Sequence, residues 1–491
     1  MSDRQSETGR SAPAGAGGRI AARTISWGRF ASFAAAIFLF VLLVVVALVW
    51  IERRPLANRF VHNELDRRGV QATYSLDRVG FRTQKVSNLV IGDPRNPDLT
   101  ARSAEIQTRF TWNGSFEVYR IVARGVRLRG QLVGGRVRWG QIDKLLPPPS
   151  DKPFKLPDFA LDIADASIAL RTPFGPVGIA IEGSGQLTGG FRGHAGIVSP
   201  RLAPGRCVAE QFRASLAVEV IARRPNVEGP VRLASFTCAV SRFRVDQPRF
   251  DAKASFNESF TSVDGSGRMA MASLVAGANG LANFTGALSY KGPLSDVRGR
   301  VTLAAQNSRL ATIYADRTRL DARYGLGLRS GRLALVGQFA ANSASLDDSM
   351  LAAVAGPLAA AAKTPIGPVA TAIGGALERT SNNFDIAGAI RLVNFPGGGG
   401  ARINDAAVSG PNGARAHIAG GTGVTYYWPE GLLRIDGTID MAGGGLPNGR
   451  VTLNQPRPGA PMSGLAEFAP YSVNGSRLTL APIRFAGAAD G

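Results

Sequence analysis

Long stretches of the chain alternate between apolar and polar residues. Residues 125–142, GVRLRGQLVGGRVRWGQI, alternate on both sides of the pair Gly134-Gly135. Successive side chains of a strand point to opposite faces, so one face of this stretch is aliphatic and the other carries arginine. The glycine pair tolerates the positive φ angles of a tight turn. The stretch therefore predicts a β-hairpin whose apolar face holds Val126, Leu128, Leu132, Val137 and Trp139.

The same period of two runs through most of the chain, including residues 70–76, 159–163, 177–181 and 433–441. Sixty glycines and 29 prolines are too frequent for a helical protein, and 491 residues exceed one compact core. We therefore predict a mainly β fold: an elongated, twisted, mostly antiparallel sheet with a few short helices. Further apolar positions predicted to line one of its faces are Leu161, Ile163, Ile168, Leu170, Ile179, Ile181, Leu433, Ile435 and Ile439.

A charge-free run of 22 residues at 30–51 is the second strong signal. As a helix it spans about 33 Å, enough for the hydrocarbon core of a bilayer. No small-x-small cleavage site follows it, so it predicts a single-pass anchor and not a cleaved signal. Long downstream domains translocate largely regardless of flanking charge. We therefore expect the tail at 1–29 in the cytoplasm and the bulk of the chain outside it.

The remaining organisation follows from local composition. Within residues 52–69, one apolar stripe is formed by Leu56, Phe60, Val61 and Leu65, which predicts a short amphipathic helix that stops the end of the sheet. An Ala-rich stretch predicts two short helices, broken near Pro365 and Pro368. The predicted domains are a disordered tail (1–29), a transmembrane helix (30–51), a short helix (52–69), a first β segment (70–343), a helical insertion (344–380) and a continuing β segment (381–491).

Residues that carry chemistry are sparse. The three histidines lie far apart with no cysteine or carboxylate at metal-ligand spacing, and no nucleophile elbow, Walker loop or HExxH motif occurs. The sequence predicts that the protein is not an enzyme and holds no metal or cofactor. Cys207 and Cys238 are an even pair in a chain placed outside the cytoplasm, which predicts a disulfide. The alternative is two buried thiols on adjacent strands.

The formal charge of +21 does not indicate a nucleic-acid partner. The basic excess is spread over strand faces and is not gathered into a recognition helix or a basic groove with aromatic side chains. It indicates either a solvated outer face or attraction to anionic lipid headgroups or lipopolysaccharide.

Several segments resemble the YdbH branch of the AsmA-like envelope proteins of Gram-negative bacteria. They are the N-terminal span with its short helix, LPDFALDIADASIALRTPFGPVGIAIEGSGQL at 156–187, and ARAHIAGGTGVTYYWPEGLLRIDG and GGGLPNGRVTLNQ within 414–455. The resemblance implies a repeating β-groove anchored in the inner membrane through 30–51. It also implies that the periplasmic sheet reaches toward the outer membrane or a partner there, and conducts phospholipid. Family members are longer than this chain, so a truncated groove is expected.

This implied function gives the alternation a physical purpose. An exposed acyl methylene costs about 0.8 kcal/mol in water, so a continuous aliphatic trough would let a lipid cross an aqueous gap. The apolar residues named above would then contact lipid. With about 12 residues per strand and turn, we expect about 35 strands and a sheet about 170 Å long. Two alternatives stay open: an assembly factor for outer-membrane proteins that pairs with client strands, and a component of dicarboxylate transport, which needs a closed polar pocket.

Overall fold

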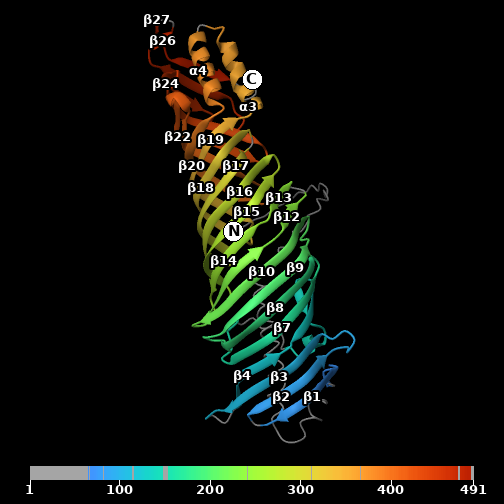
Figure 1. Ribbon diagram of the computed structural model, residues 1–491. Coiled ribbons are helices and arrows are strands. Elements are labelled where there is room, and N and C mark those ends of the chain that lie inside the picture. The colour runs from blue at the N-terminus through green and yellow to red at the C-terminus, as the bar shows by residue number, and fades with distance from the viewer. Residues whose placement is uncertain are drawn as a thin grey trace, which may run out of the picture.

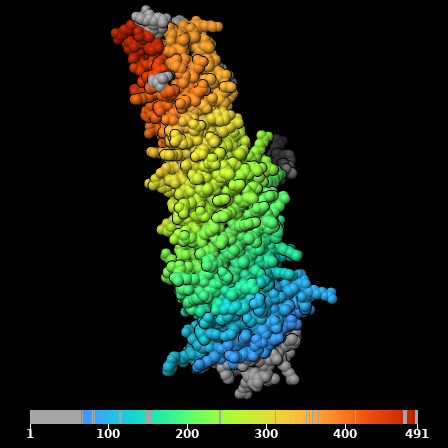
Figure 2. Space-filling view, in the orientation of Figure 1, coloured from blue at the N-terminus to red at the C-terminus, as the bar shows by residue number. Residues whose placement is uncertain are grey.

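The computed structural model describes residues 65–487, except 66, 81, 113–115, 147–152, 240–241, 311, 365 and 474–475. Within this part the chain forms one long, twisted body in which strands lie obliquely to the long axis (Figure 1). The space-filling view shows that sequence order follows the length of the body, from blue at one end to red at the other (Figure 2). The predicted mainly β, elongated and antiparallel fold is confirmed.

Twenty-six of the described strands form a single sheet, and two more form a separate hairpin. The first strands are β1 (Ala72–Val79), β2 (Thr83–Ile91), β3 (Leu99–Phe110), β4 (Phe116–Arg124), β5 (Arg127–Val133), β6 (Arg136–Arg138), β7 (Ala160–Thr172), β8 (Gly175–Gln186), β9 (Arg192–Leu202), β10 (Cys207–Ile221), β11 (Arg224–Arg232), β12 (Ser235–Cys238), β13 (Phe243–Asp246) and β14 (Arg249–Phe256). The others are β15 (Ser262–Ala276), β16 (Asn279–Pro293), β17 (Asp296–Leu310), β18 (Ile313–Gly327), β19 (Arg332–Leu346), β20 (Phe384–Phe395), β21 (Gly398–Ser409), β22 (Arg415–Trp428), β23 (Leu432–Gly443), β24 (Leu446–Asn454), β25 (Met462–Phe468), β28 (Ile483–Gly487), and the hairpin β26 (Tyr471–Val473) with β27 (Ser476–Leu478).

Neighbouring strands along the chain pair antiparallel through most of the sheet. The exception is β7, which pairs parallel with both β4 and β5. A parallel pairing requires the chain to cross back over the sheet. The 3₁₀ helix η1 (Gly140–Lys144) lies on this crossing, between β6 and β7.

The central strands are longer than the sequence predicted. β15, β16, β17 and β18 have 15 residues each and begin at Ser262, Asn279, Asp296 and Ile313, so they start at a constant interval. The expectation of a shorter repeat, about 12 residues per strand and turn, is therefore wrong for this region. Alternation alone marks the faces of a strand and not its ends, and the turns that follow β15 and β16 are very short.

Between β10 and β15 the sheet divides into two lanes. β11 and β14 pair side by side in one lane, and the short strands β12 and β13 pair in the other. Cys207 of β10 lies directly opposite Cys238 of β12, with the two Cα atoms 4.1 Å apart, and a disulfide joins their sulfurs. The bond fixes the second lane to β10 at the edge of the division.

Two helices separate β19 from β20 and lie together at one end of the body, over the strands near β24 (Figure 1). They are α3 (Asp348–Ala361) and α4 (Gly367–Thr380), and α4 starts with Pro368 in its first turn, where proline is tolerated. Val369, Ala370 and Ala376 are among its buried residues. Residues 344–346, predicted to open the helical insertion, still belong to β19.

At the opposite end the apolar face is closed by a packed core. One cluster gathers β1, β2, β3, β5 and β7 around Trp139 and Ile142, which are 1% and 0% exposed. A second cluster surrounds Ile106, Phe159 and Leu161. The segment that contains η1 places Trp139 and Ile142 over the sheet, so the crossing serves as the second layer of this core.

The predicted tail (1–29), transmembrane helix (30–51) and nearly all of the short helix (52–69) lie outside the described residues; Leu65 and Arg67 of the last are helical. Among residues 65–487, no described helix combines the length and hydropathy needed to cross a membrane.

Candidate functional site

An unbroken row of apolar residues and glycines crosses the sheet. Residues directly opposite each other on paired strands point to the same face, so the register can be followed from strand to strand. We call this set the apolar row. It consists of Ala72, Ile91, Leu99, Leu128, Ile168, Ile179, Ile197, Ala214, Val231, Phe250, Met269, Gly286, Leu303, Leu320, Phe339, Gly388, Ala406, Ile418, Ile439, Val451, Ala466 and Ile483.

The length of the row follows from strand spacing. With one residue from each strand that it crosses, at about 4.8 Å per strand, the row is about 100 Å long. This is shorter than the sheet expected from the sequence, because the strands are longer and therefore fewer. No charged residue interrupts the row between its two ends.

A second apolar row flanks the first in the central and C-terminal strands. As far as β20 its members lie two residues along each strand from the apolar row, so they point to the same face. In β21, β22 and β23 register shifts change this separation, and residues directly opposite each other carry the second row onward. They are Ala252, Gly267, Leu288, Val301, Ala322, Gly337, Ile390, Ile403, Val424 and Ile435. The two rows together make the apolar face a band and not a single line of side chains.

Exposure along the apolar row differs between its N-terminal end and the central strands. Leu99 and Leu128 are 1% and 3% exposed inside the N-terminal core. Leu303, Leu320 and Phe339, in the central strands, are only partly buried. The apolar face is therefore filled by the protein's own side chains at the N-terminal end and partly accessible at the large side chains of the central strands, whereas the small side chain of Ala406 further along is buried.

Aromatic rings lie over glycines on the apolar face. A methyl group added to Gly267 would clash with the Phe250 ring, and one added to Gly265 would meet the Tyr290 ring at 2.7 Å. The hydroxyl of Tyr290 donates to the backbone oxygen of Lys253 at 3.0 Å, and that of Tyr324 donates to the oxygen of Ser289 at 3.0 Å. Burial raises the pKa of both tyrosines above the usual value. Beside the aliphatic band, these hydroxyls are therefore neutral and hydrogen-bonded to the backbone.

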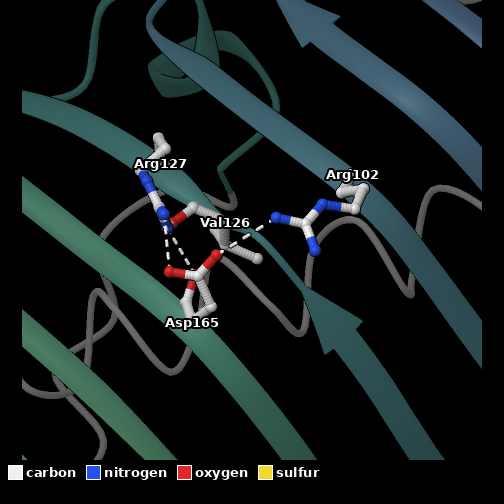
Figure 3. Close-up of polar contacts among 4 residues, drawn as sticks. All are labelled: Arg102, Val126, Arg127 and Asp165. Carbon is white, nitrogen blue, oxygen red and sulfur yellow. Dashed lines mark hydrogen bonds and ion pairs between the residues drawn. The ribbon is translucent and has the colours of Figure 1, made fainter.

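The opposite face of the sheet, which we call the polar face, carries ion pairs between neighbouring strands. Arg127 and Arg102 reach Asp165 from two different strands, at 2.5 Å and 3.4 Å, and Arg127 also donates to the backbone oxygen of Val126 at 3.1 Å (Figure 3). Asp162 accepts from Arg124 at 2.7 Å, a hydrogen bond that holds the pKa of Asp162 below its usual range. The charges of the arginines near the β5–β6 hairpin are thus partly neutralised by aspartates on neighbouring strands.

The residues predicted to line one face fall in different surroundings. Leu128, Ile168, Ile179 and Ile439 belong to the apolar row, and Ile435 belongs to the second row. Trp139, Leu161, Ile163 and Leu170 are buried in the N-terminal end, and Val126, Val137 and Ile181 pack partly buried against its first cluster. Leu132 is partly buried beside Val137, and Leu433 is 44% exposed near a strand end.

Sequence reasoning missed the middle of the row. Leu303, Leu320 and Phe339 were not singled out, although Val297, Val301 and Leu303 alternate visibly with polar residues in β17. That alternation was the available signal. No group of three histidine, cysteine or acidic side chains that could hold a metal occurs in the described part of the chain.

Comparison with known families shows which family the chain belongs to. The sequence model of the YdbH-like family, described as "Intermembrane phospholipid transport protein YdbH", matches residues 40–401. The chain belongs to the YdbH-like family. No curated protein and no solved structure matches the chain. The YdbH-like match ends within β21, so the apolar row continues beyond the matched region, from Ala406 to Ile483.

Proposed function

We propose that this protein conducts phospholipid between two membranes along the apolar row. The observation that carries the proposal is the continuity of the row over about 100 Å, in a member of a family described by intermembrane phospholipid transport. Covering acyl chains with the aliphatic band removes their apolar surface from water, which is favourable by about 25 cal/mol per Å². The headgroups can travel beside the band in solvent. Movement along such a band breaks no bond, so we propose no catalytic step.

We further propose that residues 30–51 anchor the chain in the inner membrane and that the sheet stands in the periplasm, where it reaches toward the outer membrane or a partner in it. The charge-free run at 30–51 and the family match, which begins inside that run at residue 40, support the anchor. The cysteine pair supports the compartment, because disulfides persist in oxidising environments.

The disulfide gives a direct test of compartment. Thiol labelling of protein taken from cells, denatured without reductant, is expected to find no free thiol. After reduction it should find two. Closing a loop of 31 residues is expected to stabilise the fold by about 3 to 4 kcal/mol in the entropic model, so Cys207→Ser with Cys238→Ser should lower the unfolding midpoint. Two free thiols in the unreduced sample would place the sheet in a reducing compartment.

Photo-crosslinking along the sheet tests what the apolar row contacts. A photo-reactive residue at Leu303 or Phe339 in the apolar row is expected to capture phospholipid in cells. The same residue at Val336, which is 49% exposed on the polar face of the same strand as Phe339, should not. Capture of unfolded outer-membrane protein at Leu303 or Phe339 would overturn the lipid path and favour the strand-pairing alternative.

A further inference from the structure

A hollow of about 810 Å³ lies across β15–β21 on the polar face. It is lined by two neighbouring rows of polar-face residues, one containing Thr285, Ala304 and Arg319 and the other containing Arg268, Thr302 and Asp321. Leu303 and Leu320 stand between these rows in sequence and also line the hollow. Since their side chains alternate to the apolar face, their backbone forms the floor. The hollow is therefore separated from the apolar row by the thickness of the sheet.

Two arginines that line the hollow have side chains without a partner in the described part of the chain. Within the described residues, the guanidinium groups of Arg268 and Arg319 make no ion pair and no hydrogen bond. Asp321 is already held by Arg300 through two hydrogen bonds of 2.8 Å and 2.6 Å, and that bonding keeps the pKa of Asp321 low. Asp405, also in the lining, lies 2.8 Å from His417. The hollow thus presents two free guanidinium groups.

A strip of three more arginines leads to the same row as Arg319. Arg213, Arg232 and Arg249 lie directly opposite one another on β10, β11 and β14, and the register continues through Ala270 into the hollow. All three are exposed, and in the described part of the chain none has an ion-pair partner. Like charges directly opposite in a sheet are destabilising, and a bound anion would relieve that repulsion.

The spacing of the two arginines in the hollow indicates the size of the ligand. Arg268 and Arg319 are three strands apart and one row apart, so their backbones are about 15 Å apart. The floor between them has small side chains, including Ala287 and Ala304, and two threonine hydroxyls. A guanidinium binds phosphate through two parallel hydrogen bonds. A ligand with one phosphate for each arginine must therefore be elongated, and its body can use the hydroxyls.

We propose that this hollow binds an elongated ligand with two phosphate groups, such as a disaccharide phosphorylated at both ends. Arg268 and Arg319 each hold one phosphate, and Thr285 and Thr302 contact the sugar hydroxyls. Such a molecule exists either as a soluble sugar bisphosphate or as the headgroup of a glycolipid. The site uses the face opposite the apolar row, so it does not depend on the proposed lipid path.

Binding to the full-length protein in detergent tests the site. The probes are a bisphosphorylated glucosamine disaccharide, the same disaccharide with one phosphate, and vesicles that carry its acylated form. Arg268→Gln and Arg319→Gln are each expected to lower the affinity for the soluble bisphosphate probe about tenfold. The double variant is expected to lower it about a hundredfold. The monophosphate probe should bind the parent at least tenfold more weakly. Tighter binding to the vesicles than to the soluble probe would identify the glycolipid as the source.

The matched control removes the same charge from the same face outside the hollow. Arg323 and Arg391 lie in one polar-face row with Val336 between them, and neither lines the hollow. Arg323→Gln with Arg391→Gln should bind the bisphosphate probe within twofold of the parent. Ala304→Leu fills the floor without changing charge and should weaken binding as much as either arginine variant. Equal binding of both sugar probes, or equal losses in the control and the hollow variants, would refute the two-phosphate site.

Discussion

Ile197→Asp is expected to reduce phospholipid transfer about a hundredfold, whereas Val198→Asp is expected to leave it nearly unchanged. These neighbours on β9 are both β-branched aliphatics, but they point to opposite faces. Ile197 lies in the apolar row between Ile179 and Ala214, and Val198 lies beside Arg213 with 53% of its surface exposed. A carboxylate among acyl chains costs several kcal/mol, and about 3 kcal/mol corresponds to a hundredfold in rate.

The measurement is transfer of labelled phospholipid between membranes in cells that lack redundant homologues. Protein levels are compared first, so that misfolding is not mistaken for blockage. A second matched pair lies further along the sheet: Leu335→Asp on the apolar face and Val336→Asp on the polar face of β19. Equal tolerance of charge on both faces would falsify the lipid path, and equal damage from both would indicate a closed, two-sided core.

Trp139→Ala is expected to lower the local unfolding free energy of the N-terminal end by about 3 to 5 kcal/mol. The indole is 1% exposed and packs on Gly130, where an added methyl group would come within 2.7 Å of the ring, and near Leu170. Removing the ring leaves a cavity between η1 and β5. Native-state hydrogen exchange of the amides in β5 and β7 measures the loss.

Trp112 provides the control for this change, because it is the same residue type with 108% relative exposure. Trp112→Ala is expected to change protection by less than about 0.5 kcal/mol, as surface substitutions usually do. If Trp139→Ala were equally mild, the N-terminal end of the apolar row would not be closed by packing. It would then be open to lipid like the central strands.

Local alternation predicted the faces of individual strands well. The hairpin of β5 and β6 forms around Gly134 and Gly135, whose φ angles are +57° and +78°, as the glycine pair predicted. The two helices between β19 and β20 follow from alanine content and from prolines that cannot continue a helix. These features depend on residues close together in sequence, so composition and period reveal them.

Features that depend on register were beyond the sequence. Gly286 and Gly388 belong to the apolar row although glycine carries no apolar side chain, and only the pairing of β16 and β20 with their neighbours places them there. The charge excess was visible, but its distribution was not. Arg300 and Arg319 look alike in the sequence. Arg300 is hydrogen-bonded to Asp321 on the neighbouring strand, whereas Arg319 lines the hollow.

Because β15, β16, β17 and β18 start at a constant interval, the length of the sheet is set by a whole number of equivalent strands. Removing the segment 279–312, which holds β16 and β17 with their turns, would bring Met269 of β15 opposite Leu320 of β18 without reversing any later strand. Removing a single strand would reverse the direction of everything that follows. The reach of such a sheet can therefore change only in steps of two strands, about 10 Å each. Proteins built this way can match gaps of different width by duplicating or losing hairpins, while the apolar row stays continuous.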